Sequence, residues 1–209
     1  MEDYSREEER MNVISHGIGF VLSVIGLILL LQLAFTHGTT IHVVSFSIFG
    51  SSLIILYGAS TLYHSAKDPQ RRHQLRVLDH ASIYLLIAGS YTPFTLISMA
   101  GTSAAYLFYV SWVLAITGIS LKLFFTGRFK VLSTILYVLI GSIIFLDIDP
   151  LIQNVPSQGM NWVLIGGASY LISGVLYNMK SIKYNHAIFH LFVMAGSFCH
   201  FIAVYCYIL

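Results

Sequence analysis

Long apolar runs separated by short polar breaks fill the sequence after its first 13 residues. Each run is close to the roughly 20 residues that an α-helix needs to cross the hydrocarbon core of a bilayer. The runs are continuous, whereas the strands of a membrane barrel alternate apolar with polar residues, so the pattern predicts helices. We expect seven membrane-spanning helices, over residues 14–36, 41–64, 77–98, 104–122, 131–147, 161–178 and 186–208. The fifth run is the shortest, and its helix either begins earlier, near Phe129, or thins the bilayer locally.

The composition supports the same fold class. Hydrophobic residues make up 56% of the chain and charged residues only 10%, which leaves too little polar surface for a soluble domain. The net charge of +2 is too small to favour a nucleic acid as partner. We therefore expect an all-α integral membrane protein of the cell membrane, a seven-transmembrane helix bundle. Residues 1–13 would form a short acidic cytoplasmic head and residues 14–209 a single transmembrane domain.

The basic residues predict how the helices are oriented in the membrane. All 11 fall in four segments that seven helices would place on one side: Arg6 and Arg10; Lys67, Arg71, Arg72 and Arg76; Lys122, Arg128 and Lys130; Lys180 and Lys183. The three remaining loops and the C terminus contain no Lys or Arg. Because cytoplasmic loops carry the excess of Lys and Arg, we expect the N terminus in the cytoplasm and the C terminus outside.

Apart from Asp147, the last residue of the fifth run, Asp79 is the only acidic residue within a predicted span. An ionisable group inside a membrane helix costs at least about 2.5 kcal/mol, so such a residue usually marks a polar site with a partner. The alternative is an ion pair with Arg76 at the membrane interface, because Asp79 is only three residues into its predicted helix. The other polar residues at the same depth favour the first interpretation.

Four histidines stand at the cytoplasmic ends of predicted helices, at the depth of Asp79: His16, His64, His186 and His190. His186 and His190 have the i, i+4 spacing that places two imidazoles on one helix face, about 5–6 Å apart. His64 could supply a third nitrogen, and three imidazoles with a vacant fourth position are typical of a catalytic zinc site. Interfacial histidines often bind only water or lipid headgroups, but three histidines and a carboxylate at one depth favour a metal site.

The roles of five further polar residues stay open at this point: Glu9, Asn12, His16, His80 and His200. The first three share one face of a helical lead-in, which is typical of a solvated, capped helix start or of a site. His80 either faces another helix or supports the site from behind. His200 lies about 15 Å deeper than His190, so we expect a buried hydrogen-bonding residue rather than a ligand. Ser60 is one turn before His64, where it lines the site, allows close helix packing or bonds back to a carbonyl.

Four stretches carry a resemblance to a known family: E-R-M-N-V-I-S-H at residues 9–16, S-T-L-Y-H at 60–64, L-D-H-A-S-I-Y at 78–84 and N-H-A-I-F-H at 185–190. The chain resembles bacterial hemolysin III-type members of the progestin and adipoQ receptor superfamily, which includes adiponectin receptors and is similar to alkaline ceramidases. The resemblance implies a Zn2+ site whose ligands are His64, His186 and His190. It also implies that Asp79 holds the water on the zinc and that Ser60 lines the site.

A metal site at the cytoplasmic leaflet favours chemistry on lipids, because it would meet lipid carbonyls before soluble ones. The leading hypothesis is zinc-dependent hydrolysis of an amide or ester bond in a membrane lipid, with Asp79 as base and Ser60 assisting at the oxyanion. The resemblance suggests a ceramide-like amide. A non-catalytic lipid sensor that regulates membrane homeostasis is the alternative. The pore-forming, cytolytic activity that the family name implies has no basis in the sequence, and a transporter's relay would find only His200 in the outer halves of the spans.

Overall fold

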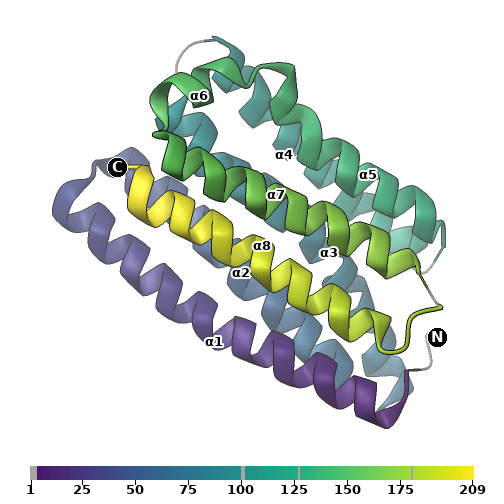
Figure 1. The fold of residues 1–209 in the computed structure, drawn as a ribbon. Helices are drawn as coiled ribbons and strands as arrows, with labels where there is room; N and C mark the ends of the chain where they lie inside the picture. The colour runs from purple at the N-terminus through teal and green to yellow at the C-terminus, as the bar shows by residue number, and fades with distance from the viewer. Residues whose placement is uncertain (1–3, 100–101, 127, 180) are drawn as a thin grey trace.

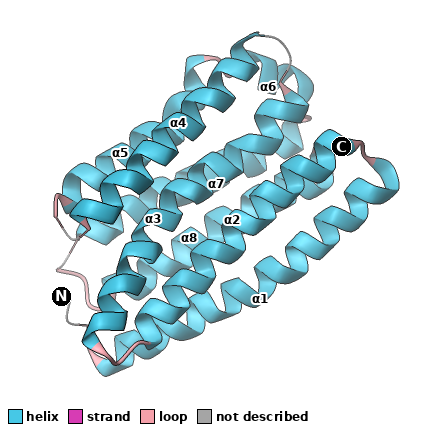
Figure 2. Cartoon of the chain, turned by 180° about the vertical axis from the view of Figure 1, so that it is seen from behind, coloured by secondary structure: helices cyan, strands magenta, loops and turns pink. Residues whose placement is uncertain are grey.

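The computed structural model describes residues 4–99, 102–126, 128–179 and 181–209, and every regular element within these ranges is helical. The α-helices are α1 (Arg6–His37), α2 (Thr40–Ser65), α3 (Pro69–Pro93), α4 (Thr102–Phe125), α5 (Lys130–Ser142), α6 (Asp149–Asn154), α7 (Ser157–Asn178) and α8 (Asn185–Tyr207). A π-helical turn, Phe94–Ser98, extends α3, and a 3-10 turn, Ile143–Leu146, extends α5. Figure 1 shows the long helices side by side in one bundle, and Figure 2 shows the same bundle from behind. The expected all-α class is confirmed.

Six helices of the described chain are long and apolar enough to cross a membrane: α1, α2, α3 with its π-helical turn, α4, α7 and α8. The fifth predicted run instead forms α5 and its 3-10 turn, a shorter apolar stretch over Val131–Leu146. Its 13 α-helical and 4 further residues rise about 28 Å, just under the roughly 30 Å of hydrocarbon. The seventh crossing therefore stays a prediction.

Helix α1 begins at Arg6 because the acidic segment carries the signals of a helix start. The Ser5 hydroxyl accepts a hydrogen bond from the Glu8 backbone N–H at 3.1 Å, and three acids occupy the first turn, where the helix dipole favours negative charge. The buried face of α1 then runs through Glu8, Asn12 and His16. The lead-in that the sequence predicted is thus helical, and one of its faces packs against the bundle.

The helices pack in the order α7, α8, α1, α2, α3 and α4, and α5 contacts α3, α4 and α7 more sparsely. Helices α1 and α2 approach closely at Gly19, where a Cβ atom would lie 2.7 Å from the Tyr57 ring. The Tyr57 hydroxyl donates to Ser197 Oγ at 2.7 Å, and the Tyr170 hydroxyl bonds to the same oxygen at 2.9 Å. These bonds join α2, α7 and α8 inside the apolar core.

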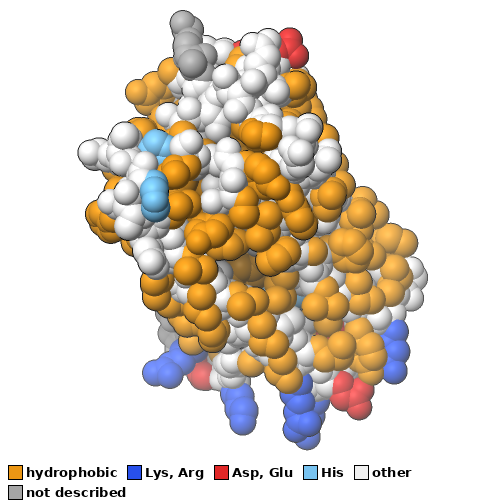
Figure 3. All heavy atoms as spheres, turned by 60° about the vertical axis from the view of Figure 1, so that its left-hand side comes forward, with side chains coloured by type: hydrophobic (Ala, Val, Ile, Leu, Met, Phe, Trp, Pro, Cys, Tyr) orange, Lys and Arg blue, Asp and Glu red, His pale blue; other side chains and the backbone are white. Residues whose placement is uncertain are grey.

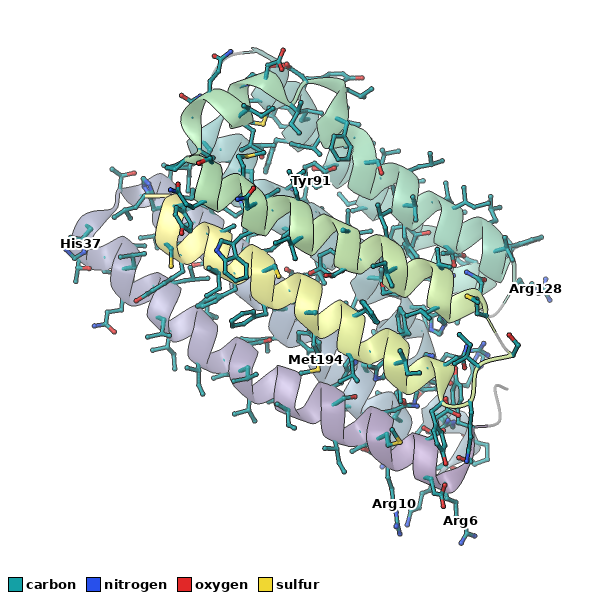
Figure 4. The ribbon with its side chains drawn as sticks, viewed as in Figure 1. Arg6, Arg10, His37, Tyr91, Arg128 and Met194 are labelled. Carbon is teal, nitrogen blue, oxygen red and sulfur yellow. The ribbon has the colours of Figure 1, made fainter. Side chains whose placement is uncertain are left out.

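The charged residues separate along the bundle. Arg6, Arg10 and Arg128 lie at one end and His37 at the other (Figure 4), and Lys and Arg side chains gather at one end of the face in Figure 3. The two chain ends also lie at opposite ends of the bundle (Figure 1). This separation agrees with the distribution used to predict the orientation, which itself stays a prediction.

Two of the basic residues that the sequence analysis assigned to the segments between spans lie inside helices and are buried. Arg76 belongs to α3 and is 8% exposed, and Lys122 belongs to α4 and is 5% exposed. A charge beside or at the end of an apolar run ordinarily faces water, so the burial of these two residues corrects the expectation from the sequence. Both long side chains are in fact buried within the bundle.

Candidate metal centre

The three histidines expected to bind a metal lie together where α8 begins. His64, at the end of α2, meets His186 and His190 from α8, and one ring nitrogen of each lies within 4.8 Å of the other two. All three side chains are buried. Nε2 of His64 is 3.2 Å from Nε2 of His186. Residues far apart in the chain thus bring three nitrogen donors to one point, an arrangement compatible with a metal site.

A carboxylate from α1 holds the Nδ1 atom of His64. Oε2 of Glu9 lies 2.6 Å from this atom, and the other Glu9 oxygen accepts a hydrogen bond from the Arg72 guanidinium. Because Nδ1–H donates to the carboxylate, Nε2 keeps its lone pair and faces the other histidines. The sequence left the role of Glu9 open, and its place on the His16 face of α1 was the available signal.

His190 is oriented in the same way by a serine. Nδ1 of His190 lies 3.3 Å from Ser15 Oγ, whose own hydrogen is donated to the Asn12 carbonyl at 3.1 Å. The serine oxygen is left to accept from Nδ1–H, so Nε2 of His190 also keeps its lone pair. Sequence reasoning missed Ser15, because a single serine on an apolar helix carries no distinguishing pattern.

The acidic start of α1 also accepts hydrogen bonds from α8 and from the turn before it. Oε1 of Glu8 accepts a hydrogen bond from the His186 backbone N–H at 3.2 Å, so a carboxylate caps the N-terminus of α8. In the turn before α8, the Tyr184 hydroxyl donates to Glu7 at 2.6 Å. Helix α1 therefore helps to position the helix that carries two of the three clustered histidines.

His16 lies beside the cluster, but its ring nitrogens are not among the three that meet there. Its ring stacks on that of His190, with ring centroids 3.4 Å apart and an interplanar angle of 9°. Both of its ring nitrogens are buried and find no hydrogen-bond partner within the described part of the chain. His16 thus lies at the depth expected from the sequence, but it packs against one member of the cluster instead of joining it.

A cavity of about 420 Å³ lies beside the histidines, between α3, α5, α7 and α8. Most of its lining is apolar, and its polar lining residues include His16, Ser60, Asp79, His186 and His190. Ser60 Oγ is buried and has no hydrogen-bond partner among the described residues. The two residues predicted to assist catalysis, Ser60 and Asp79, therefore share a cavity with two of the three histidines, and their roles stay predictions.

Asp79 lies next to His80, not in the ion pair with Arg76 that the sequence left open. Oδ2 of Asp79 is 3.6 Å from Nδ1 of His80, and no ion pair of the described residues joins Asp79 to Arg76. His80 bonds through Nδ1 to the Arg76 carbonyl at 2.8 Å and lies 3.4 Å through Nε2 from the Tyr177 hydroxyl. His80 thus faces α7, one of the two orientations considered above.

His200 has the hydrogen-bonding role expected from the sequence. Its Nε2 atom lies 3.2 Å from the Val163 carbonyl oxygen on α7. The ring also lines the cavity, but it takes no part in the histidine cluster.

Comparison with known proteins places the chain in a family. The family model described as haemolysin-III related matches residues 4–201. Hemolysin-3 of Bacillus cereus is 43% identical over 203 residues, which cover 97% of this chain and 93% of the relative. The Hemolysin-3 homolog of Bacillus subtilis is 39% identical over 204 residues, which cover 98% of this chain and 96% of that protein.

A more distant relative indicates the wider superfamily. The human monocyte to macrophage differentiation factor is 27% identical over 167 residues, which cover 77% of this chain and 69% of that protein. This similarity fits the progestin and adipoQ receptor superfamily. With its apolar helices and a family match over nearly its whole length, the chain is a multi-pass membrane protein that belongs to the haemolysin-III related family.

Proposed function

We propose that this protein is a zinc-dependent hydrolase that cleaves an amide or ester bond in a membrane lipid. The observation that carries the proposal is the convergence of three buried imidazole nitrogens, from His64, His186 and His190, beside a largely apolar cavity inside the bundle. The cluster offers ligands for a metal, and the cavity offers space for an apolar chain.

One distance within the cluster supports zinc as the metal. Two nitrogens bound tetrahedrally at 2.0–2.1 Å from one ion are about 3.3 Å apart, and the Nε2 atoms of His64 and His186 are 3.2 Å apart. The Nδ1 atoms of His64 and His190 are engaged with oxygen atoms, so their Nε2 atoms are the available donors. Three histidine ligands leave a fourth position for water or substrate, as in catalytic zinc sites.

The residues around the cluster have complementary roles in the proposed hydrolysis. A bound zinc ion supplies Lewis acidity, which polarises a carbonyl and lowers the pKa of water to about 7. Asp79 accepts the proton of the attacking water on its carboxylate and passes it to the leaving group. Ser60 Oγ, which has no other partner among the described residues, donates a hydrogen bond to the carbonyl oxygen as negative charge develops there.

The position of the cavity favours a lipid substrate. Its walls come largely from helices that are apolar enough to cross a membrane, and most of its lining is apolar. An acyl chain in this space would be removed from water and would exclude bulk water from the cavity. The resemblance to alkaline ceramidases suggests that the cleaved bond is a ceramide-like amide.

The topology that goes with this function has seven crossings and a cytoplasmic N terminus. Support comes from the two chain ends at opposite ends of the bundle and from α5, which with its 3-10 turn nearly matches the hydrocarbon thickness. In this orientation the histidine cluster lies near the cytoplasmic leaflet.

Metal analysis of the purified protein, combined with incubation with its own membrane lipids, tests the proposal. We expect about one zinc per chain, and mass spectrometry should show loss of an acylated lipid with release of its fatty acid. The His186→Ala, His190→Ala double variant is the control, and it should neither contain zinc nor release fatty acid. A wild-type protein without zinc would contradict the proposal.

A zinc-containing lipid sensor is the second candidate function. The same cluster joins α2 to α8, and Glu8 and Glu9 fasten both helices to α1, so metal binding would also lock the relative positions of three helices. Stoichiometric zinc without turnover of any membrane lipid would favour this candidate.

A further inference from the structure

Lys122, in the last turn of α4, points into the bundle and away from water. It is 5% exposed, its Nζ atom donates a hydrogen bond to Ser133 Oγ at 2.6 Å, and Nζ lies 5.9 Å from the centroid of the Tyr137 ring. All three residues line the cavity beside the histidines. A lysine near the end of a membrane helix normally extends so that its ammonium reaches the headgroup region. The inward orientation therefore indicates a partner inside the cavity.

The charges around Lys122 do not balance. Arg76 is 8% exposed, its Nε atom lacks a hydrogen-bond partner among the described residues, and it lies close enough to Lys122 for the two to repel each other. His80 is within electrostatic range of both cations and of Asp79. Asp79 supplies one negative charge, and no ion pair of the described residues gives either cation a carboxylate partner. Two buried cations against one carboxylate are costly unless an anion neutralises the excess.

The rest of the cavity suits an apolar chain. From Lys122 and Ser133 the lining continues through apolar side chains of α3, α5 and α7 to Leu151 in α6, toward the other end of the bundle (Figure 1). Cβ atoms added at Gly141 and Gly167, which face this space, would meet no atom within 4 Å. Tyr91, also in the lining, lies between α7 and the α5–α6 region in Figure 4. The cavity is therefore cationic at one end and apolar along most of its length.

We propose that this cavity binds a lipid with an anionic head group, a phosphate or a carboxylate, which pairs with the Lys122 ammonium, while Ser133 Oγ holds that ammonium in place. Its apolar chain extends toward α6. Charge-assisted hydrogen bonds of this kind are strong in a low-dielectric site, and a neutral head group would leave the excess positive charge uncompensated. The inference rests on the proposed function, for which it names the substrate class as an anionic lipid that contains the cleaved amide or ester bond, in place of a neutral ceramide.

Native mass spectrometry of the purified full-length protein in detergent tests this binding without requiring turnover. The wild-type protein is titrated with dioleoyl phosphatidic acid, with dioleoylglycerol, which has the same chains and no phosphate, with oleate, and with inorganic phosphate. We expect phosphatidic acid to bind at least about tenfold more tightly than dioleoylglycerol, because it adds a charge-assisted hydrogen bond. Oleate in place of phosphatidic acid would show that the head group is a carboxylate.

Variants at the cationic end define the site. Lys122→Met should remove the preference for the anionic lipid, and Lys122→Arg should retain it. Lys183→Met, which changes an exposed lysine before α8, should leave the preference unchanged. Ser133→Ala is a milder change that should weaken binding a few fold, and it keeps the test decisive if Lys122→Met does not fold.

Three results would overturn the inference. The first is equal affinity for phosphatidic acid, oleate and dioleoylglycerol. The second is a folded Lys122→Met variant that binds these lipids like Lys183→Met. The third is inorganic phosphate that binds as tightly as the lipid. The His186→Ala, His190→Ala double variant separates this inference from the proposed hydrolase. If it keeps the anionic preference without metal, the inference stands whether or not turnover exists. If the preference disappears with the metal, the metal and not Lys122 holds the head group.

Discussion

Glu9 and His64 are 55 residues apart in the sequence, yet an oxygen of the Glu9 carboxylate lies 2.6 Å from Nδ1 of the His64 ring. The contact joins α1 to α2 and turns Nε2 of His64 toward α8. Arg72, at the start of α3, binds the second carboxylate oxygen and so restrains Glu9 itself. Three helices therefore determine the orientation of one candidate metal ligand.

Glu9→Gln should weaken zinc binding by about 10- to 100-fold without unfolding the protein, because groups that orient a ligating histidine typically have effects of this size. Competition with a chromophoric chelator measures the affinity. Glu7→Gln is the matched control, since Glu7 is two residues away and a glutamine there can still accept the hydrogen bond of the Tyr184 hydroxyl. An equal loss in both variants would assign the effect to the overall charge of the segment.

Each of the single substitutions His64→Ala, His186→Ala and His190→Ala should strongly lower the zinc content, because the two nitrogens that remain hold zinc poorly. His37→Ala and His73→Ala change exposed histidines and should have no effect. Elemental analysis of the purified variants gives the zinc-to-protein ratio. Zinc that survives the combined change of His186 and His190 would locate the site elsewhere.

His16→Ala should retain zinc, because the His16 ring stacks on His190 and its nitrogens lie outside the converging set. We expect some loss of thermal stability from the lost packing, and His16→Phe should recover part of it by restoring the stack. Zinc content and melting temperature are measured on the same samples. If both variants lose zinc, His16 is a ligand and the site is closed by four histidines.

Helices and the histidine cluster could be predicted from the sequence because both depend on local spacing. Apolar runs of spanning length mark helices, and the i, i+4 spacing of His186 and His190 places both rings on one face whatever the neighbouring helices do. The depth of His64 then followed from counting helices. These inferences needed no knowledge of which side chains meet across the bundle.

The hydrogen-bond partners of the histidines could not be predicted in this way. Which atom meets Nδ1 of His190 depends on the rotation of α1 about its own axis, and that rotation is set by packing along the whole helix. The burial of Lys122 could not be predicted from the sequence either. A charge near the end of an apolar run ordinarily belongs to a loop, and only the packing of α4 against α5 turns it inward.

Reporter fusions after residues 70, 126 and 182 should all read as cytoplasmic, and fusions after residues 38, 101 and 154 as external. The expectation follows because all 11 basic residues fall in alternate connections or in the helix ends beside them. The fusion after residue 154 is the informative one, because it reports whether α5 and its 3-10 turn cross the membrane. A cytoplasmic reading there would leave six crossings and would place the C terminus on the same side as the N terminus.

Asp79→Asn separates catalysis from structure. The substitution keeps the size of the side chain and its hydrogen-bonding capacity but removes the charge and the ability to accept a proton. Because Asp79 lines the cavity without joining the converging nitrogens, zinc should be largely retained, with at most about a 10- to 100-fold loss of affinity. Hydrolysis should fall by about 10² or more, the usual contribution of general acid–base catalysis.

His64→Ala provides the contrast for this variant, since it should lose metal and thermal stability together. Zinc content, melting temperature and lipid turnover are compared across wild type, Asp79→Asn and His64→Ala. If Asp79→Asn releases zinc as completely as His64→Ala, Asp79 is itself a ligand, four protein groups close the site, and the sensor becomes the better interpretation. If zinc and turnover are both unchanged, the proton transfer proposed for Asp79 is wrong, because a base removed from the reaction must slow it.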